Sequence, residues 1–158
     1  MAPVAKFSLA IDAPVATVWQ AMIELKRYRE WNPFIVDVET ADALARVGAK
    51  MLLEVRWGRG GGTRSPEVVS RVEPPALVGG AERALLAYDY KGWPARFGLV
   101  LGTRLQTLSR APGAPTTYET VEEFGGLLSR GVPLAKVQDG FERHARALKA
   151  RAEAAAKA

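Results

Sequence analysis

Few side chains in this sequence can act as nucleophiles or metal ligands. The chain has no cysteine and one histidine, His144. Thiolate catalysis, cysteine-bound zinc and multi-histidine metal sites are therefore excluded, and we predict neither a metal nor a cofactor. No serine and aspartate pairing with His144 is evident, and this residue lies one position from an apolar helical stripe. We interpret His144 as a packed side chain and assign no catalytic residue.

The glycine-rich segment 58–62 has the composition of a phosphate-binding loop. Such a loop is followed by a Lys-Ser/Thr pair and opens a helix. Neither feature follows this segment, so the sequence favours a β-hairpin turn.

Charge and hydropathy limit the partners. The chain has 22 Lys and Arg against 17 Asp and Glu, a net charge of +5, and most cations have an acidic residue nearby. Nucleic-acid-binding proteins concentrate positive charge, so we predict no nucleic-acid partner. No apolar run approaches the roughly 18 residues of a membrane span, and no secretory signal is visible. We expect a cytoplasmic protein without stable membrane insertion, and the sequence leaves a homodimer open.

Any candidate site must be positioned by elements that the hydrophobic pattern predicts. Residues 4–11 read as a strand, and the segment Asp12-Ala13-Pro14 reads as a helix start. Apolar residues follow at helical spacing over 15–25. A second short helix is predicted over 26–31 and ends at Asn32-Pro33.

The middle of the chain is β in character. Alternating residues predict strands at 36–39, 51–57, 65–73, from 76 after Pro74-Pro75, 97–110 and 116–124. Residues 81–96 fit either a strand or a helical turn.

The C-terminal segment reads as one long helix. From Pro133 onward, apolar residues recur at steps of three and four. Gly140 interrupts this pattern at a cost of about 1 kcal/mol relative to alanine. Three explanations are open: a bend in the helix, close packing of another group against its backbone, or a glycine that the helix simply tolerates.

These elements predict an α+β fold in a single domain over residues 1–158, since this length suits one domain. A curved antiparallel sheet of about seven strands would be covered by the long C-terminal helix, with two short helices near the N-terminus. A curved sheet cannot contact a straight helix everywhere. We therefore expect a gap at one end, of the kind that binds small molecules.

Several motifs occur in a familiar order. They are APVATVWQAM, the tetrad Trp31-Asn32-Pro33-Phe34, and EEFGGLL followed by a helix containing ALKARAEA. Together they resemble the SRPBCC superfamily of START-like, helix-grip proteins, in particular bacterial polyketide cyclase/dehydrase-type domains. The resemblance implies a helix-grip fold over nearly the whole chain. Members include lipid carriers, hormone receptors, cyclases and Hsp90-activator-like domains, so the fold does not determine the function.

The resemblance also implies which residues of two long strands point inward. The inward set is Gly102, Arg104, Gln106 and Leu108 on one strand, and Tyr118, Thr120, Glu122 and Phe124 on the next. Similar bacterial proteins tend to carry histidine at the position of Arg104 and phenylalanine at that of Gln106. Hydrophobicity alone predicts the opposite for the first strand, because Leu99, Leu101 and Leu105 share its other face.

An unpaired buried charge costs several kcal/mol. We therefore hypothesise that Arg104 and Glu122 form a hydrogen-bonded ion pair at the polar end of the pocket. The alternative is a cross-strand pair on the outer surface. The predicted ligand-binding residues are this pair with Phe34, Leu53, Val55, Trp57, Tyr88, Tyr118, Phe124 and Phe141. Each apolar one is by itself more typical of a plain core than of a ligand contact, and the tyrosines either offer a hydroxyl to a ligand or anchor a sheet edge.

The leading functional hypothesis is binding of a hydrophobic or amphipathic small molecule, such as a lipid, an isoprenoid or a polyketide-like compound, between the sheet and the C-terminal helix. The alternatives are a cyclase/dehydratase-type enzyme that uses Glu122 and Arg104, and an Hsp90-activator-like interaction module. Pairing with Arg104 would lower the pKa of Glu122, which favours binding over catalysis. An interaction module predicts a filled interior and an exposed apolar patch.

Overall fold

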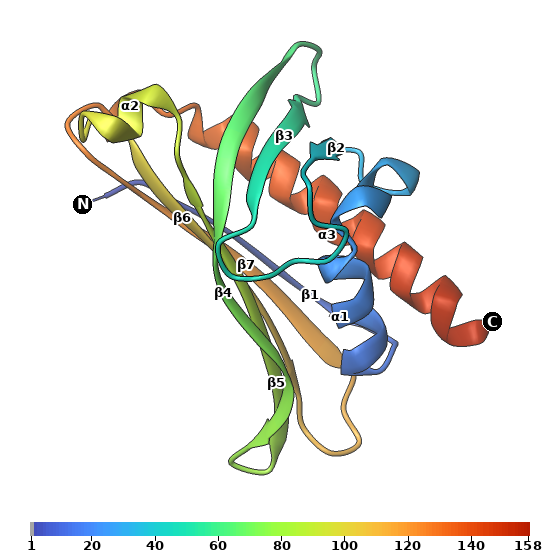
Figure 1. Ribbon diagram of the computed structural model, residues 1–158. Helices are drawn as coiled ribbons and strands as arrows, with labels where there is room; N and C mark the ends of the chain where they lie inside the picture. The colour runs from blue at the N-terminus through green and yellow to red at the C-terminus, as the bar shows by residue number, and fades with distance from the viewer. Residues whose placement is uncertain (1) are drawn as a thin grey trace.

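The computed structural model describes residues 2–158, which form one curled antiparallel sheet and a long helix (Figure 1). The strands are β1 (Val4–Ile11), β2 (Ile35–Glu39), β3 (Lys50–Arg56), β4 (Gly62–Val78), β5 (Ala81–Tyr90), β6 (Leu101–Arg110) and β7 (Thr116–Gly125). The helical segments are α1 (Val15–Ile23), η1 (Leu25–Glu30), α2 (Trp93–Arg96), η2 (Ser129–Gly131) and α3 (Leu134–Lys157). The predicted α+β helix-grip architecture is confirmed.

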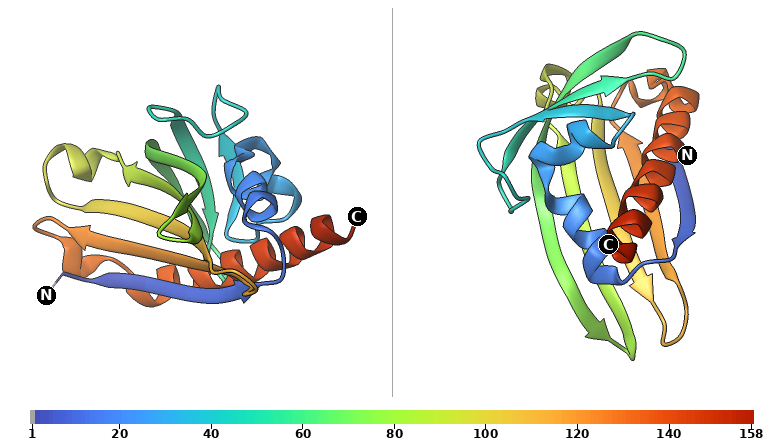
Figure 2. Two further views of the ribbon diagram at one scale, coloured as in Figure 1. Left: turned by 90° about the horizontal axis from the view of Figure 1, so that it is seen from below. Right: turned by 90° about the vertical axis from the view of Figure 1, so that its right-hand side faces the viewer.

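The seven strands have the order β1-β7-β6-β5-β4-β3-β2, and all neighbouring pairs are antiparallel. The chain from β2 to β7 is thus a simple meander, and β1 is added beside β7. Helices α1 and η1 connect β1 to β2, which lie at opposite edges of the sheet. Figure 2 shows α3 running along the concave side, with α1 beside its C-terminal half. No helix over residues 2–158 combines the length and apolar character needed to cross a bilayer.

The turn after η1 is tied to α3 by a buried hydrogen-bond network. Asn32 Oδ1 accepts hydrogen bonds from the backbone N–H groups of Phe34 (3.0 Å) and Ile35 (2.9 Å), so its amide nitrogen must face His144. That nitrogen donates to Nδ1 of His144 at 3.1 Å, which leaves the ring proton on Nε2. His144 is fully buried, and burial lowers its pKa well below the usual range. It is therefore a neutral, packed side chain, as its place beside the apolar stripe indicated.

Three details of the predicted secondary structure were wrong, and the choice left open for residues 81–96 is resolved. Strand β4 continues through Pro74-Pro75, because the pairing with β5 shifts register between Glu73 and Ala76 and the prolines fall in that irregularity. Strand β6 begins at Leu101 instead of residue 97, since α2 and a turn at Gly98 precede it. Residues 81–96 contain both a strand and a helical turn. Asp12 does not cap α1, which begins after Pro14 without a side-chain cap.

Gly140 lies in α3 where the ring of Phe34 packs directly on the helix backbone. A Cβ atom at this position would lie 2.1 Å from Cε1 of Phe34. The glycine therefore permits close contact between the Asn32 turn and α3, which is one of the explanations that the sequence left open.

We expect Gly140→Ala to destabilise the protein by about 2 kcal/mol, because the added methyl group overpacks the contact with Phe34. In an unobstructed helix the same change stabilises by about 1 kcal/mol, so the sign of the effect is diagnostic. Urea unfolding measures the difference. Gly131→Ala is the matched control, since a Cβ there meets no atom within 4 Å. A stabilised G140A protein would contradict the packing described.

Candidate functional site

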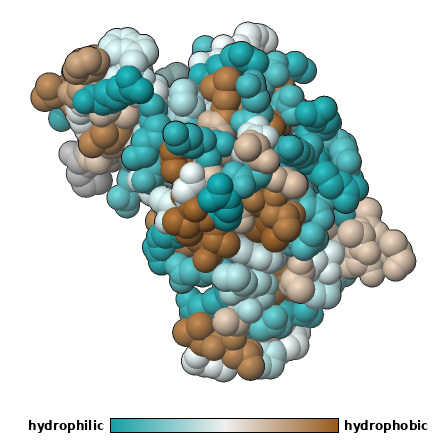
Figure 3. Space-filling model, viewed as in Figure 1, coloured by the Kyte–Doolittle hydropathy of each residue, from teal (hydrophilic) through white to brown (hydrophobic). Residues whose placement is uncertain are grey.

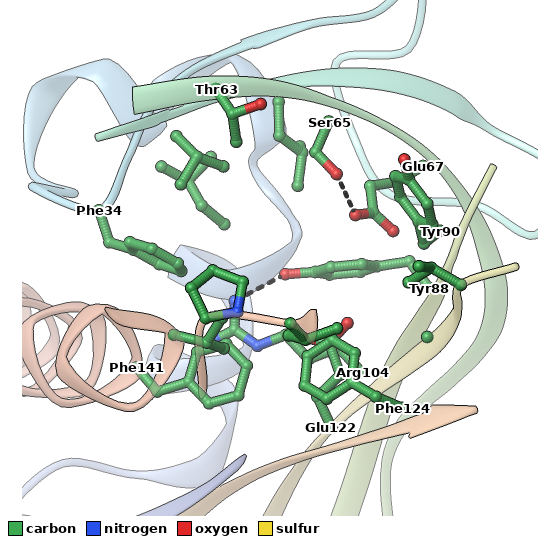
Figure 4. Close-up of a pocket in the computed structure, with 18 of the residues that line it drawn as sticks. Phe34, Thr63, Ser65, Glu67, Tyr88, Tyr90, Arg104, Glu122, Phe124 and Phe141 are labelled. Carbon is green, nitrogen blue, oxygen red and sulfur yellow. Dashed lines mark hydrogen bonds between the residues drawn. The ribbon is translucent and has the colours of Figure 1, made fainter. Parts of the chain in front are cut away.

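A cavity of about 230 Å³ lies between the concave face of the sheet and the N-terminal half of α3 (Figure 4). Its apolar wall includes an aromatic cluster. The Phe34 ring meets the ring of Phe141 edge to face, with centroids 6.0 Å apart, and lies at 6.0 Å from the Trp57 ring. Leu53 and Val55 reach the same wall because alternate residues of β3 point inward.

The polar wall is built around Arg104, whose side chain is buried, with 2% of the residue exposed. Its Nε donates to Thr120 Oγ1 at 2.9 Å and its Nη1 donates to the Tyr88 hydroxyl at 2.9 Å. Its Nη2 lies 3.5 Å from the Tyr118 hydroxyl. The guanidinium carbon also lies 4.1 Å from the centroid of the Phe141 ring, as in a cation–π contact. Arg104 thus points inward, and the outer-surface alternative was wrong.

The predicted ion pair between Arg104 and Glu122 is absent. The two residues are opposite each other in the register of β6 and β7, and both line the cavity. Among residues 2–158, however, the polar partners of the guanidinium are Thr120, Tyr88 and Tyr118 rather than a carboxylate. Hydroxyl groups and the Phe141 ring face take the place of the expected counter-ion.

The cavity also contains two carboxyl groups with raised pKa values. Burial raises the pKa of Glu122 to about 7, and the attraction of Arg104 only partly opposes this effect. The expectation of a lowered pKa was therefore wrong, because the loss of solvation outweighs the attraction. Burial and the charge of Glu122 together raise the pKa of Glu67 to about 8, although Ser65 Oγ donates to Glu67 Oε1 at 2.7 Å.

Glu67 was missed by the sequence analysis. It lies on β4, on the same side of the strand as Ser65 and the buried Val69. Period-two alternation from Val69 was the signal that points Glu67 inward. From its residue type alone, Glu67 is predicted to face solvent, because acidic side chains are seldom buried.

Nine of the ten predicted site residues line the cavity: Phe34, Leu53, Val55, Trp57, Tyr88, Arg104, Glu122, Phe124 and Phe141. Tyr118 does not. It is fully buried behind Arg104, where its hydroxyl donates to Gln106 Oε1 at 2.7 Å and its ring stacks on His144 at 6.3 Å. Whether the nine residues contact a ligand stays a prediction.

The Tyr88 hydroxyl has an unusual role in this network. Its oxygen accepts hydrogen bonds from Arg104 and from Gln106 Nε2, the latter at 3.3 Å. Its own proton is therefore directed elsewhere, and Tyr88 lines the cavity. Arg104 has five N–H donors, of which three have acceptors among residues 2–158. Two N–H groups of Arg104 and the Tyr88 hydroxyl proton thus have no acceptor among residues 2–158, and both residues line the cavity.

Comparison with solved structures places this architecture among helix-grip proteins. A hypothetical protein from Helicobacter pylori superposes with a TM-score of 0.69 at 11% identity, over 94% of this chain and 87% of that one. The di-domain ARO/CYC protein BexL of the BE-7585A biosynthetic pathway superposes with a TM-score of 0.63 at 16% identity, over 98% of this chain and 50% of the BexL chain. A norcoclaurine synthase from Thalictrum flavum superposes with a TM-score of 0.64 at 12% identity, over 96% of this chain and 94% of that one.

These likenesses establish the fold. It is the helix-grip fold, which confirms at the level of the fold the resemblance seen in the sequence. No protein-family model matches the chain, and no curated protein matches it.

The two carboxyl groups make stability depend on pH. Their pKa values, about 8 for Glu67 and about 7 for Glu122, lie above the ordinary value of 4.5. The folded chain therefore binds more protons than the unfolded chain between these limits, and stability falls as the pH rises across that window. We expect Glu67→Gln to reduce the loss of stability between about pH 5 and about pH 9, measured by urea unfolding.

Glu123→Gln is the control for this prediction, because Glu123 is exposed on the opposite face of β7. An unchanged pH dependence in E67Q would show that the Glu67 carboxyl is not held in its neutral form.

Proposed function

We propose that the protein binds an amphipathic small molecule in the cavity, with an apolar ring system against the aromatic wall and an oxygen-bearing, anionic head group against Arg104. The observation that carries this proposal is the buried Arg104 guanidinium, which lines the cavity and forms no ion pair with a carboxylate among residues 2–158. A buried cation is costly, and an anionic ligand would supply the missing charge together with charge-assisted hydrogen bonds.

The size of the cavity supports a compact ligand. An apolar cavity of about 150 Å³ holds benzene, whereas this one has about 230 Å³. The enclosed part of the ligand is thus about the size of two fused rings. A long acyl chain would have to leave the cavity, so within the ligand classes expected from the sequence we favour an aromatic or polyketide-like compound.

The test uses 2-naphthoate as the probe and naphthalene as its uncharged counterpart. We expect Arg104→Gln to reduce the preference for naphthoate over naphthalene by at least about tenfold, because a hydrogen bond to a charged group contributes about 1.5–3 kcal/mol. Binding is measured by fluorescence titration or calorimetry. Arg83→Gln, an exposed arginine on β5, is the control.

Tyr88→Phe provides a second variant that keeps the ring and removes only the hydroxyl, in case R104Q folds poorly. It should weaken naphthoate binding several-fold and leave naphthalene binding unchanged. Equal losses for both probes, or no saturable binding to the wild type, would refute the proposal. Extraction and mass spectrometry of the freshly purified protein would then identify any natural ligand.

A second candidate function is acid–base catalysis on such a ligand. The observation in its favour is the pair of carboxyl groups in the cavity, whose pKa values of about 7 and about 8 suit proton transfer near neutral pH. Two structural neighbours, an ARO/CYC protein and a synthase, are consistent with this candidate. Glu122 is the better base, because it lies opposite Arg104, which can stabilise developing negative charge.

We expect base-promoted ring opening of 5-nitrobenzisoxazole, a bicyclic probe of carboxylate bases in apolar sites, to be accelerated at rates that rise with pH through about 7. Absorbance of the nitrophenol product measures this rate. Glu122→Gln should abolish the acceleration and retain naphthoate binding, whereas Glu123→Gln should change neither. A rate equal to that of buffer would leave binding as the function.

A further inference from the structure

A group of exposed apolar side chains lies at one end of the molecule, beside the cavity. It includes Trp93 (68% exposed), Phe97 (71%), Leu101 (47%), Leu127 (83%) and Leu128 (57%). We call residues 93–101 and 126–131 together the apolar tip. Figure 3 shows apolar surface at its upper left, where Figure 1 places α2. Large apolar side chains exposed together mark an interaction site.

The apolar tip is held in a fixed shape. The backbone N–H of Leu127 donates to the Gly98 carbonyl at 3.2 Å, and that of Leu128 donates to the Leu99 carbonyl at 2.7 Å. These bonds join the two segments of the tip. Gly126 makes this approach possible, since its φ is +95° and a Cβ there would lie 2.6 Å from the Gly98 and Leu99 carbonyl oxygens. Backbone hydrogen bonds between the two segments thus hold the exposed side chains in place.

The charge around the tip is mainly positive. Segments 91–101 and 125–137 contain four cations, Lys91, Arg96, Arg130 and Lys136, and no aspartate or glutamate. All four cations are exposed. Lys91 Nζ lies 3.9 Å from Asp89 Oδ2, just outside these segments. The other three cations form no ion pair among residues 2–158, whereas elsewhere in the chain cations mostly have acidic neighbours, as in the ion pairs of Arg27 with Glu24 and Glu30. The mixed surface predicted for the whole sequence does not extend to this end.

We propose that the apolar tip docks on the surface of an anionic lipid bilayer. Trp, Phe and Leu side chains enter the boundary between headgroups and acyl chains, where tryptophan is favoured. Each exposed Lys or Arg near such a surface contributes further attraction to anionic headgroups. A second copy of the tip is a poorer partner, because two copies would bring together six cations, Arg96, Arg130 and Lys136 from each, that have no carboxylate partner among residues 2–158. This contact is peripheral and requires no spanning helix.

Docking in this way places the cavity next to the bilayer. Val100, Val132 and Pro133 line the cavity and lie in or directly beside the two segments of the tip. An apolar ligand would then pass between membrane and cavity with little exposure to water. The docking proposal itself is independent of which ligand the cavity binds.

The test is flotation of the purified full-length protein with vesicles. We expect binding to vesicles of phosphatidylcholine and phosphatidylglycerol in equal parts, and much weaker binding to phosphatidylcholine alone. The double variant L127S/L128S should lose at least about tenfold in partitioning, since burial of a leucine contributes about 1.5–3 kcal/mol. R96Q/R130Q should lose several-fold per cation on anionic vesicles only, because each contributes about 1 kcal/mol.

The matched control is L77S/V78S at the β4–β5 turn, where both side chains are also exposed (76% and 55%) and lie outside the tip. It should bind as the wild type does. Trp93 gives an independent readout, because its emission should shift to shorter wavelength on anionic vesicles and this shift should be absent in W93F. Failure of the wild type to float, or an equal loss in the control, overturns the proposal. The proposal is also overturned if L127S/L128S changes only the self-association of the protein, measured by sedimentation velocity, and leaves vesicle binding unchanged.

Discussion

A buried arginine without a carboxylate partner determines the character of this protein. Transferring a guanidinium from water to an apolar interior is unfavourable unless its donors are satisfied. Arg104 is held by hydroxyl groups from β5 and β7 and by the ring of Phe141 on α3. These neutral partners satisfy hydrogen bonds without neutralising the charge, so the cavity keeps a positive potential. The sheet and α3 must both be in place for this arrangement to exist.

The carboxyl groups of Glu67 and Glu122 make that potential adjustable. Below their raised pKa values of about 8 and about 7 they are neutral, and the charge of Arg104 dominates the cavity. When both ionise, the three groups together carry a net charge of −1. Affinity for an anion and the capacity to accept a proton therefore change in opposite directions with pH. The two proposed functions, anion binding and acid–base chemistry, would therefore use one site in different protonation states.

The shape of the site follows from the size of the residues along α3. Ala145 at the middle of the helix and Ala152 in its C-terminal half are fully buried, and these small side chains let α1 and the sheet approach closely. Toward its N-terminal half, the bulky ring of Phe141 lies under Arg104 and beside Phe34. The cavity consequently lies at this end of the helix. The same end carries the apolar tip, so the cavity and the proposed docking surface lie side by side.

The sequence by itself determined most of the elements, the antiparallel sheet and nine of the twenty residues that line the cavity, because period-two and period-3.6 patterns report which face of an element is buried. Its motifs also supplied the inward orientation of Arg104, which hydrophobicity alone assigned to the other face. Only the tertiary structure decided what Arg104 contacts. Register placed Glu122 opposite it, yet Tyr88 and Phe141, distant in the chain, supply its contacts instead. The pKa of Glu122 and the inward place of Glu67 likewise depend on burial, which arises only when distant segments pack together.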